Sequence, residues 1–478
     1  MIYNIRQILK KHSLLITIMQ EHQPMTELLS QYYDSILKEL TDSAATVFDD
    51  FPSSFYNNLS AKIIPKMKIQ CEKILYILKL DQNHQHLEKR KQFADLIQLL
   101  KHDGAIRELT IDRESLMVRI RQGNGSYDRK ALFHIPYSKR QHVSSQRFNI
   151  SGDPCLYLSV YPGLKLFANE MLELSWMESG MPKVFHFCLY ELQEKLVFLH
   201  FAKKGSEYLQ EYDDSKTDEQ KADRLDAIEQ YLLTLPLRIA CFVGIDHKYL
   251  KSNTYYYEEY VIPQLLMEWI QQSSYFDGLA YQSASGFHEA RLLDSYNVVI
   301  PTKNIDLMDG YDKRLKKCFK LSAPEKISIL EDIRKIENEM MEVIKYSKRL
   351  EEALLINPAS GRHPYRRLLA ICYSLYSIYS SLKNENDLNA AFPMQQLDAL
   401  YHSLLLISKT IDNAETAEEW VTSFKYYKND GILTSNDYDD VLKDFHVVNE
   451  AVIKLQTVLR PKMRHMIAIG NIDFEFIE

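Results

Sequence analysis

Five short runs of β-branched and aromatic residues lie in the middle of the sequence, and helical patterns fill most of the chain on either side. The runs are SLMVRIR (115–121), CLYLSVY (155–161), KVFHFCLY (183–190), LVFLHF (196–201) and NVVIPTKN (297–304). Their lengths and bounding turns are typical of β-strands. Helical stretches such as 223–233 and 259–272 interrupt them at irregular intervals, which does not fit a repeated βαβ unit. The sequence therefore predicts an α+β centre with a mixed sheet.

The flanks of this centre are predicted to be helical. Apolar residues recur every three or four positions in the first hundred residues and again after Pro324, and a chain of 478 residues is long enough for more than one core. We expect a helical N-terminal region at 1–108, an α+β domain at 111–306 and a helical C-terminal region at 322–478.

The C-terminal region contains a heptad-like pattern, which predicts a long helix packed against one partner helix. Its apolar positions are Ile329, Ile333, Ile336, Met340, Val343, Ser347, Leu350 and Leu354. The partner is either a helix of the same chain, in a hairpin or bundle, or a second copy in a homo-oligomer. A basic stretch, RHPYRR (362–367), is interpreted as a helix start because Pro364 suits a first turn.

Composition and charge indicate a soluble cytoplasmic protein without nucleic-acid, membrane or metal partners. Hydrophobic residues make up 46%, charged residues 26%, and the net charge is −7. The N-terminal apolar stretch LLITIM is too short for a membrane span, and six cysteines without a CxxC pair indicate reduced thiols. No phosphate loop, dinucleotide fingerprint, HExxH or nucleophile elbow is present. We expect the charged run at 202–224 to be an exposed, mobile insertion.

Charged and polar residues beside the predicted strands suggest a ligand site. Arg119 lies on one face of its strand, Arg147 precedes a Gly-Asp-Pro turn, Glu170 follows the next strand, and Ser283 ends DGLAYQS. Arginine binds phosphate oxygens through paired hydrogen bonds, and a carboxylate can stabilise the cationic transition state of glycosidic cleavage. The residue types fit a phosphate-bearing ligand, provided that the fold gathers them.

Residues 111–306, taken in order, resemble the RES-domain family. The matching pieces are MVRIR, LFHIPY, QRFNISGDPCLYLS, a following Glu, LPLRIACFV, YVIPQLL and FDGLAYQS. RES domains are similar in fold to ADP-ribosyltransferases, and characterised members are toxins that consume NAD⁺. The resemblance implies an ADP-ribosyltransferase-like sheet domain between the two helical regions, with NAD⁺ as substrate and no cofactor.

The resemblance also implies the roles of individual residues. The family's site positions fall on Arg119, Arg147, Tyr157, Glu170, Tyr281 and Ser283. The arginines are expected to hold the NAD⁺ diphosphate and the tyrosines to bind substrate, while Glu170 and Ser283 act at the ribose as catalytic residues. The sequence departs from the family pattern at two places. Phe148 stands where the family often has tyrosine. Glu173 lies one helical turn beyond Glu170, so the family's acidic position falls on either Glu170 or Glu173.

Three functions are compatible with these residues. The first is an NAD⁺-degrading toxin or defence effector that cleaves the nicotinamide–ribose bond with water or phosphate as acceptor. The second is an ADP-ribosyltransferase that modifies a macromolecule, and the third is an interaction module that senses a nucleotide. The helical flanks suggest regulation through oligomerisation, an inhibitory antitoxin or an activating trigger.

Overall fold

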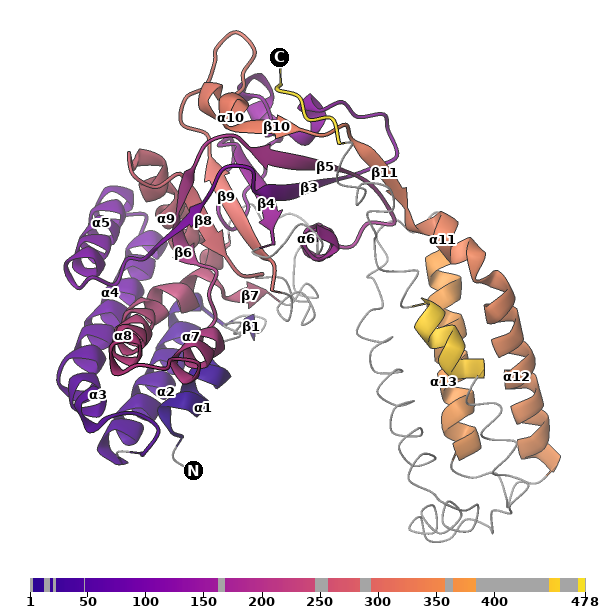
Figure 1. Cartoon of the computed structure of the whole chain (residues 1–478), viewed down its shortest axis with the longest axis horizontal. Coiled ribbons are helices and arrows are strands. Elements are labelled where there is room, and N and C mark those ends of the chain that lie inside the picture. The colour runs from indigo at the N-terminus through magenta and orange to yellow at the C-terminus, as the bar shows by residue number, and fades with distance from the viewer. Residues whose placement is uncertain are drawn as a thin grey trace.

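The structure is a computed structural model of the whole chain. It describes residues 3–12, 18–19, 23–46, 48–161, 168–245, 257–283, 294–356, 364–383, 447–455 and 472–477. Figure 1 shows a central sheet with helices packed beside it and a long pair of helices that projects away from one edge.

One mixed sheet of nine strands forms the centre of the described part of the chain. The strands run in the order β10–β5–β3–β4–β9–β8–β6–β2, and β11 pairs with β5 as well. Their bounds are β2 (Glu108–Ile111), β3 (Leu116–Gln122), β4 (Cys155–Val160), β5 (Val184–Leu192), β6 (Leu196–Phe201), β8 (Gly278–Tyr281), β9 (Tyr296–Pro301), β10 (Phe319–Leu321) and β11 (Glu325–Ser328). The predicted α+β class is confirmed, and each predicted strand is present to within a residue or a few residues at its ends.

Neighbouring strands of the sheet are antiparallel, with the exception of β6 and β8, which run parallel. A parallel pair requires a crossover connection. Here the connection contains α7 (Gly205–Asp213), α8 (Asp218–Cys241), the two-residue strand β7 (Gly244–Ile245) and α9 (Val261–Gln272). This crossover covers one face of the sheet at β8 and β6.

The crossover corrects one sequence-based expectation. Part of the charged run at 202–224 forms α7, in which Tyr208 and Leu209 are buried, and the rest leads into α8. The expectation of an exposed, mobile insertion is therefore wrong for α7. The charges lie on its outer side, while the apolar side chains recur at helical spacing and face the core.

The N-terminal helices share a core with the crossover. They are α1 (Ile5–Lys11), α2 (Met25–Thr46), α3 (Ser53–Asn58), α4 (Ile64–Gln82) and α5 (His86–His102), with a π-helical turn at Leu59–Ile63. A single apolar cluster joins Leu29 of α2 and Ile74 of α4 to Leu232 of α8 and Leu279 of β8. Figure 1 shows this helical group beside α7, α8 and α9.

The C-terminal helices form an intramolecular pair. α11 (Ile329–Lys335) and α12 (Glu337–Ile356) are separated by a break at Ile336, and α12 lies against α13 (Pro364–Lys383), as Figure 1 shows. The predicted single long helix is thus two helices, but the heptad positions up to Ser347 are buried as expected, while the side chains of Leu350 and Leu354 lie outside the described residues. The predicted helix start at Pro364 is confirmed.

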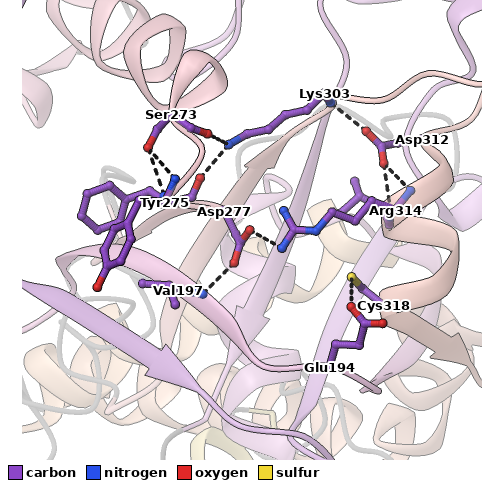
Figure 2. A network of polar contacts seen from close by, with 11 residues as sticks. Glu194, Val197, Ser273, Tyr275, Asp277, Lys303, Asp312, Arg314 and Cys318 are labelled. Atoms are coloured by element: carbon purple, nitrogen blue, oxygen red, sulfur yellow. Dashed lines mark hydrogen bonds and ion pairs between the residues drawn. The ribbon is translucent and has the colours of Figure 1, made fainter.

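Figure 2 shows a polar network around Asp277, at the start of β8. One Asp277 carboxylate oxygen accepts a hydrogen bond from the backbone N–H of Val197 at 2.7 Å, and the other pairs with Arg314 of α10 (Lys313–Cys318). Lys303 donates to the backbone carbonyls of Ser273 and Phe276 at 2.8 and 2.6 Å. The network holds the N-terminal end of β8 in position. It thereby also limits where the C-terminal end of the strand, with Tyr281 and the following Ser283, can lie.

Candidate active site

Three neighbouring strands place polar side chains on one face of the sheet. Ser159 of β4 pairs with Asn297 of β9, and Asn297 pairs with Tyr281 of β8. Residues paired across strands point to the same face, so these three side chains lie together. The Ser159 hydroxyl donates to Asn297 Oδ1 at 2.8 Å, which fixes the orientation of the amide.

A carboxylate from the covering helix joins this group. Glu178 is the last residue of α6 (Ala168–Glu178), and the Ser283 hydroxyl, the Arg147 charge and the Asn297 amide all act on its carboxylate. Removal from water raises the pKa of Glu178 above its ordinary value, and those three groups oppose that rise. Solvent still reaches the side chain. Glu178 is an exposed residue at the end of its helix, so its carboxylate meets solvent as well as these three groups.

Asn297 has a free donor beside this carboxylate. Its side chain is buried, and the Nδ2 group has no hydrogen-bond partner at ordinary distance. The amide is nevertheless close enough to Glu178 to lower the pKa of that carboxylate. A buried donor without a close partner is costly in a folded protein, and a ligand that accepted a hydrogen bond from it would remove that cost.

Arg147 is held at this site by backbone carbonyls. Its Nη1 donates to the carbonyl oxygens of Cys241 at 3.1 Å and Val243 at 2.7 Å, at the end of α8. The guanidinium lies 5.5 Å from the ring centre of Tyr260. Among the described residues, these Nη1 contacts are the hydrogen bonds that Arg147 makes, which leaves Nε and Nη2 able to meet phosphate oxygens.

The aromatic residues around Arg147 form a buried wall. The Tyr157 hydroxyl donates to Asn149 Oδ1 at 2.7 Å, and burial raises the pKa of both Tyr157 and Tyr281 well above the ordinary value. The Phe148 ring centre lies 4.6 Å from that of Tyr281. Phe148, where RES domains often have tyrosine, is therefore a core residue here that supports Tyr281.

Glu259, on the short 3₁₀ turn Glu258–Tyr260, is a second buried acid near Arg147. It is 3% exposed, and its Oε1 has no hydrogen-bond partner in the described structure. Burial raises its pKa, while the Arg147 charge lowers it. The Arg147 charge therefore acts on two carboxylates, those of Glu178 and Glu259, whose pKa values are both raised by desolvation.

Arg119 lies on the opposite face of the sheet from this group. The pairing of Val118 with Ser159 puts Val118 on the face of the site, so alternation along β3 turns Arg119 away from it. Arg119 instead donates to the backbone carbonyl of Phe133 at 2.8 Å and acts on the Tyr190 hydroxyl. The predicted facing of the β3 side chains is confirmed, but it separates Arg119 from Arg147.

Glu170 lies at the other end of α6 from Glu178. The Ser295 hydroxyl donates to its Oε2 at 3.4 Å, and burial together with the nearby Asp294 raises its pKa. The structure therefore gathers four of the six predicted site residues, Arg147, Tyr157, Tyr281 and Ser283, and leaves Glu170 and Arg119 outside that group. Two residues that the sequence analysis did not name, Glu178 and Asn297, lie with these four.

Glu178 and Asn297 could have been found only in part from the sequence. Alternation along NVVIPTKN places Asn297 on the same face as Val299, but nothing in the sequence marks that face as the one with Tyr281. Glu178 sits eight positions beyond Glu170 in the stretch EMLELSWME, which offers three acids on one helix. Only the position of α6 across the sheet distinguishes them.

The described residues contain no group of three or more His, Cys, Asp or Glu side chains arranged to hold a metal ion. Within the same residues, no helix is both long enough and apolar enough to span a bilayer.

Comparison with known proteins gives one distant similarity. The chain is 28% identical over 214 residues to a Bacillus subtilis (strain 168) protein described as "Putative toxin YopC". The match covers 43% of this chain and 45% of that relative, so the chain spans less than half of the relative's length. No protein-family model matches the chain. No solved structure matches it either.

Proposed function

We propose that this chain cleaves the nicotinamide–ribose bond of NAD⁺. The observation that carries the proposal is the convergence of Glu178, Ser283 and Arg147 on one face of the sheet. The RES-like pattern of residues 111–306 and the α+β sheet support the same reaction. Similarity to a protein described as a putative toxin supports the coarser part of the proposal, a role as a toxin or defence effector.

Each side chain has a defined part in the proposed reaction. Arg147 binds the diphosphate through Nε and Nη2, and the buried tyrosines flank the nicotinamide end. As the bond between ribose C1′ and the nicotinamide nitrogen breaks, its electron pair goes to the nitrogen and the ribose becomes cationic. The Glu178 carboxylate stabilises that cation, and Ser283 holds the carboxylate in place.

An acceptor completes the reaction. Water attacks C1′ and loses a proton, which gives ADP-ribose, nicotinamide and H⁺. Phosphate would give ADP-ribose 1″-phosphate instead, and a nucleophile on a macromolecule would give an ADP-ribosylated product. A toxin that acts on the NAD⁺ of its own cell needs restraint, so an inhibitory partner protein belongs to the proposal.

The test is incubation of the purified full-length protein with NAD⁺, with and without phosphate, followed by mass spectrometry of the products. Glu178→Gln should lower kcat by about a hundredfold or more, since it removes a charge that acts in the transition state. Glu170→Gln is the matched control on the same helix and should stay close to wild type.

The outcomes separate the alternatives. The product identifies the acceptor: free ADP-ribose indicates water, ADP-ribose 1″-phosphate indicates phosphate, and an ADP-ribosylated macromolecule indicates transfer. Loss of activity in Glu170→Gln but not in Glu178→Gln would keep the reaction and move the acid to Glu170. Binding of NAD⁺ by the wild type without any turnover would contradict the enzyme and favour a nucleotide-sensing module.

A further inference from the structure

Two stretches of chain surround Arg147, and both belong to the crossover between β6 and β8. The first stretch connects the C-terminal end of α8 to β7. It contains Val243, whose backbone carbonyl accepts a hydrogen bond from Arg147 at 2.7 Å. The second is the 3₁₀ turn Glu258–Tyr260, which places the Tyr260 ring 5.5 Å from the guanidinium. The position of Arg147 therefore depends on the position of these two stretches.

The N-terminal region fastens the first stretch. The two-residue strand β1 (Ile18–Met19) pairs in parallel with β7, with Ile18 opposite Gly244. Gly244 directly follows Val243. The buried Tyr33 hydroxyl of α2 also donates to the Pro236 carbonyl of α8 at 2.8 Å.

Glu258 fastens the second stretch. Its Oε2 accepts from the backbone N–H of Met25 at 2.9 Å, and its Oε1 accepts from Gln82 Nε2 at 3.4 Å. Met25 is the first residue of α2, where backbone N–H groups lack partners within the helix and where a negative charge is favoured. One carboxylate thus links the start of α2 and the end of α4 to the turn that carries Tyr260.

A second ion pair joins the same two groups of helices without touching the Arg147 surroundings. Glu268 of α9 accepts from Arg90 of α5 through Nε at 3.0 Å and Nη2 at 2.9 Å. Glu268 lies about two helical turns beyond the start of α9, so it joins the N-terminal helices to the crossover away from the 3₁₀ turn. The chain therefore contains a matched control for Glu258.

We propose that Glu258 is a positioning residue, through which the N-terminal helices hold the Arg147 surroundings in the ligand-binding conformation. In this arrangement the helices are a support of the site rather than a cover over it. The proposal rests on the proposed function for the identity of the ligand, NAD⁺, but not for the structural coupling between Glu258 and Arg147.

The experiment compares full-length Glu258→Ala, Glu258→Gln and Glu268→Gln with wild type. Amide hydrogen exchange is followed at 241–245 and 257–261, and KM and kcat are measured for NAD⁺. Glu258→Ala should speed exchange in both stretches and raise KM by about tenfold, with a smaller change in kcat. Glu258→Gln keeps one acceptor oxygen, so its exchange rates and KM should stay close to those of wild type. Glu268→Gln should change neither the exchange rates in these stretches nor KM.

Unchanged exchange at 241–245 and 257–261 in a folded Glu258→Ala protein would overturn the proposal, as would an equally large effect in Glu268→Gln. If Glu258→Ala does not fold, Glu258→Asp takes its place, because its side chain is one methylene too short to reach both Met25 and Gln82, and it is compared with Glu268→Gln by the same criteria. If the wild type neither binds nor consumes NAD⁺, the proposed function fails, and the exchange measurement still decides the positioning role.

Discussion

The carboxylate of Glu178, at the end of α6, and the amide of Asn297, in β9, act on one another across the covered face of the sheet. Ser159 orients that amide by donating to its Oδ1 at 2.8 Å. A neutral donor next to a desolvated carboxylate favours its ionised form. The amide thus acts with Ser283 and Arg147 against the rise in the pKa of Glu178 that burial causes.

Replacing Asn297 with Asp should shift the pH dependence of activity. The change puts a second carboxylate beside Glu178, and repulsion between like charges raises the pKa of the pair further. If ionised Glu178 is required, the acidic limb of the kcat profile should move upward by on the order of one pH unit. Ser159→Ala leaves the charge unchanged and is the control. A profile of Asn297→Asp that overlays the wild-type curve would argue against ionised Glu178 as the group that limits activity.

Arg147 and Arg119 should respond differently to truncation. Arg147→Ala removes a charged group that faces the site, so KM for NAD⁺ should rise by about tenfold or more, as expected for loss of a charged hydrogen bond. Arg119→Ala removes a donor to the Phe133 carbonyl on the opposite face. It should lower the free energy of unfolding and leave KM near wild type, as measured by urea denaturation and initial rates. An equal rise of KM in both variants would place both arginines at the ligand.

These two arginines show how far the sequence can specify the site. Alternation along SLMVRIR correctly separates Arg119 from Val118, because a strand has a side-chain period of two. The choice of face cannot be made locally, since it depends on which strand pairs with β3 and in which register. Arg147 is different: its site follows from a turn beside β4, so nearby sequence already limits where it can lie.

The acidic residue shows where sequence reasoning ends. Glu170, Glu173 and Glu178 share one helix, and any of them matches the chemistry. The contacts with Ser283 and Asn297 arise from strands more than a hundred positions later, which no local pattern describes. The burial of α7 cannot be predicted locally for a similar reason, because the charged composition of 202–224 conceals the helical spacing of Tyr208 and Leu209.

His134 should make the protein lose stability in mild acid. It is fully buried, its Nε2 accepts from the backbone N–H of Asp312 at 2.9 Å, and burial lowers its pKa from 6.5 to about 4. His134 therefore binds a proton near pH 6.5 in the unfolded chain, but in the folded chain it does so only near pH 4. The stabilisation from neutral His134 is complete above the unfolded pKa and is lost as the pH falls towards the folded one.

The measurement is the free energy of unfolding of wild type and His134→Gln at several pH values between 7 and 4. The shift corresponds to a loss of on the order of 3 kcal/mol for wild type across that interval. The variant should start less stable and show a shallower slope. The control is His142→Gln, which removes a histidine at an exposed position. Parallel slopes for wild type and His134→Gln would show that His134 titrates normally.

Gly278 should not tolerate a side chain. A Cβ atom there would lie 2.3 Å from the Val299 carbonyl oxygen and 3.1 Å from the Phe198 ring, so β8 and β9 would have to separate. Gly278→Ala should lower the free energy of unfolding by about 1–3 kcal/mol. Gly125→Ala, where the nearest atom is 3.7 Å away in Tyr127, is the control and should stay near wild type. Equal stability of the two variants would contradict the close approach of β8 to β9.

The apolar cluster shared by the N-terminal helices and the crossover has a consequence for synthesis. Its members extend from Ile5 to Val299, so the first helices leave the ribosome long before their packing partners exist. A core built from such distant contacts closes late, and its apolar surfaces remain exposed meanwhile. Arg147 likewise gains its contact with Val243 only after that residue has been synthesised. Glu178 gains its contacts with Ser283 and Asn297 later still. Nascent chains that stop short of β9 therefore lack a complete site, and a cell would meet the assembled site only after most of the protein has been translated.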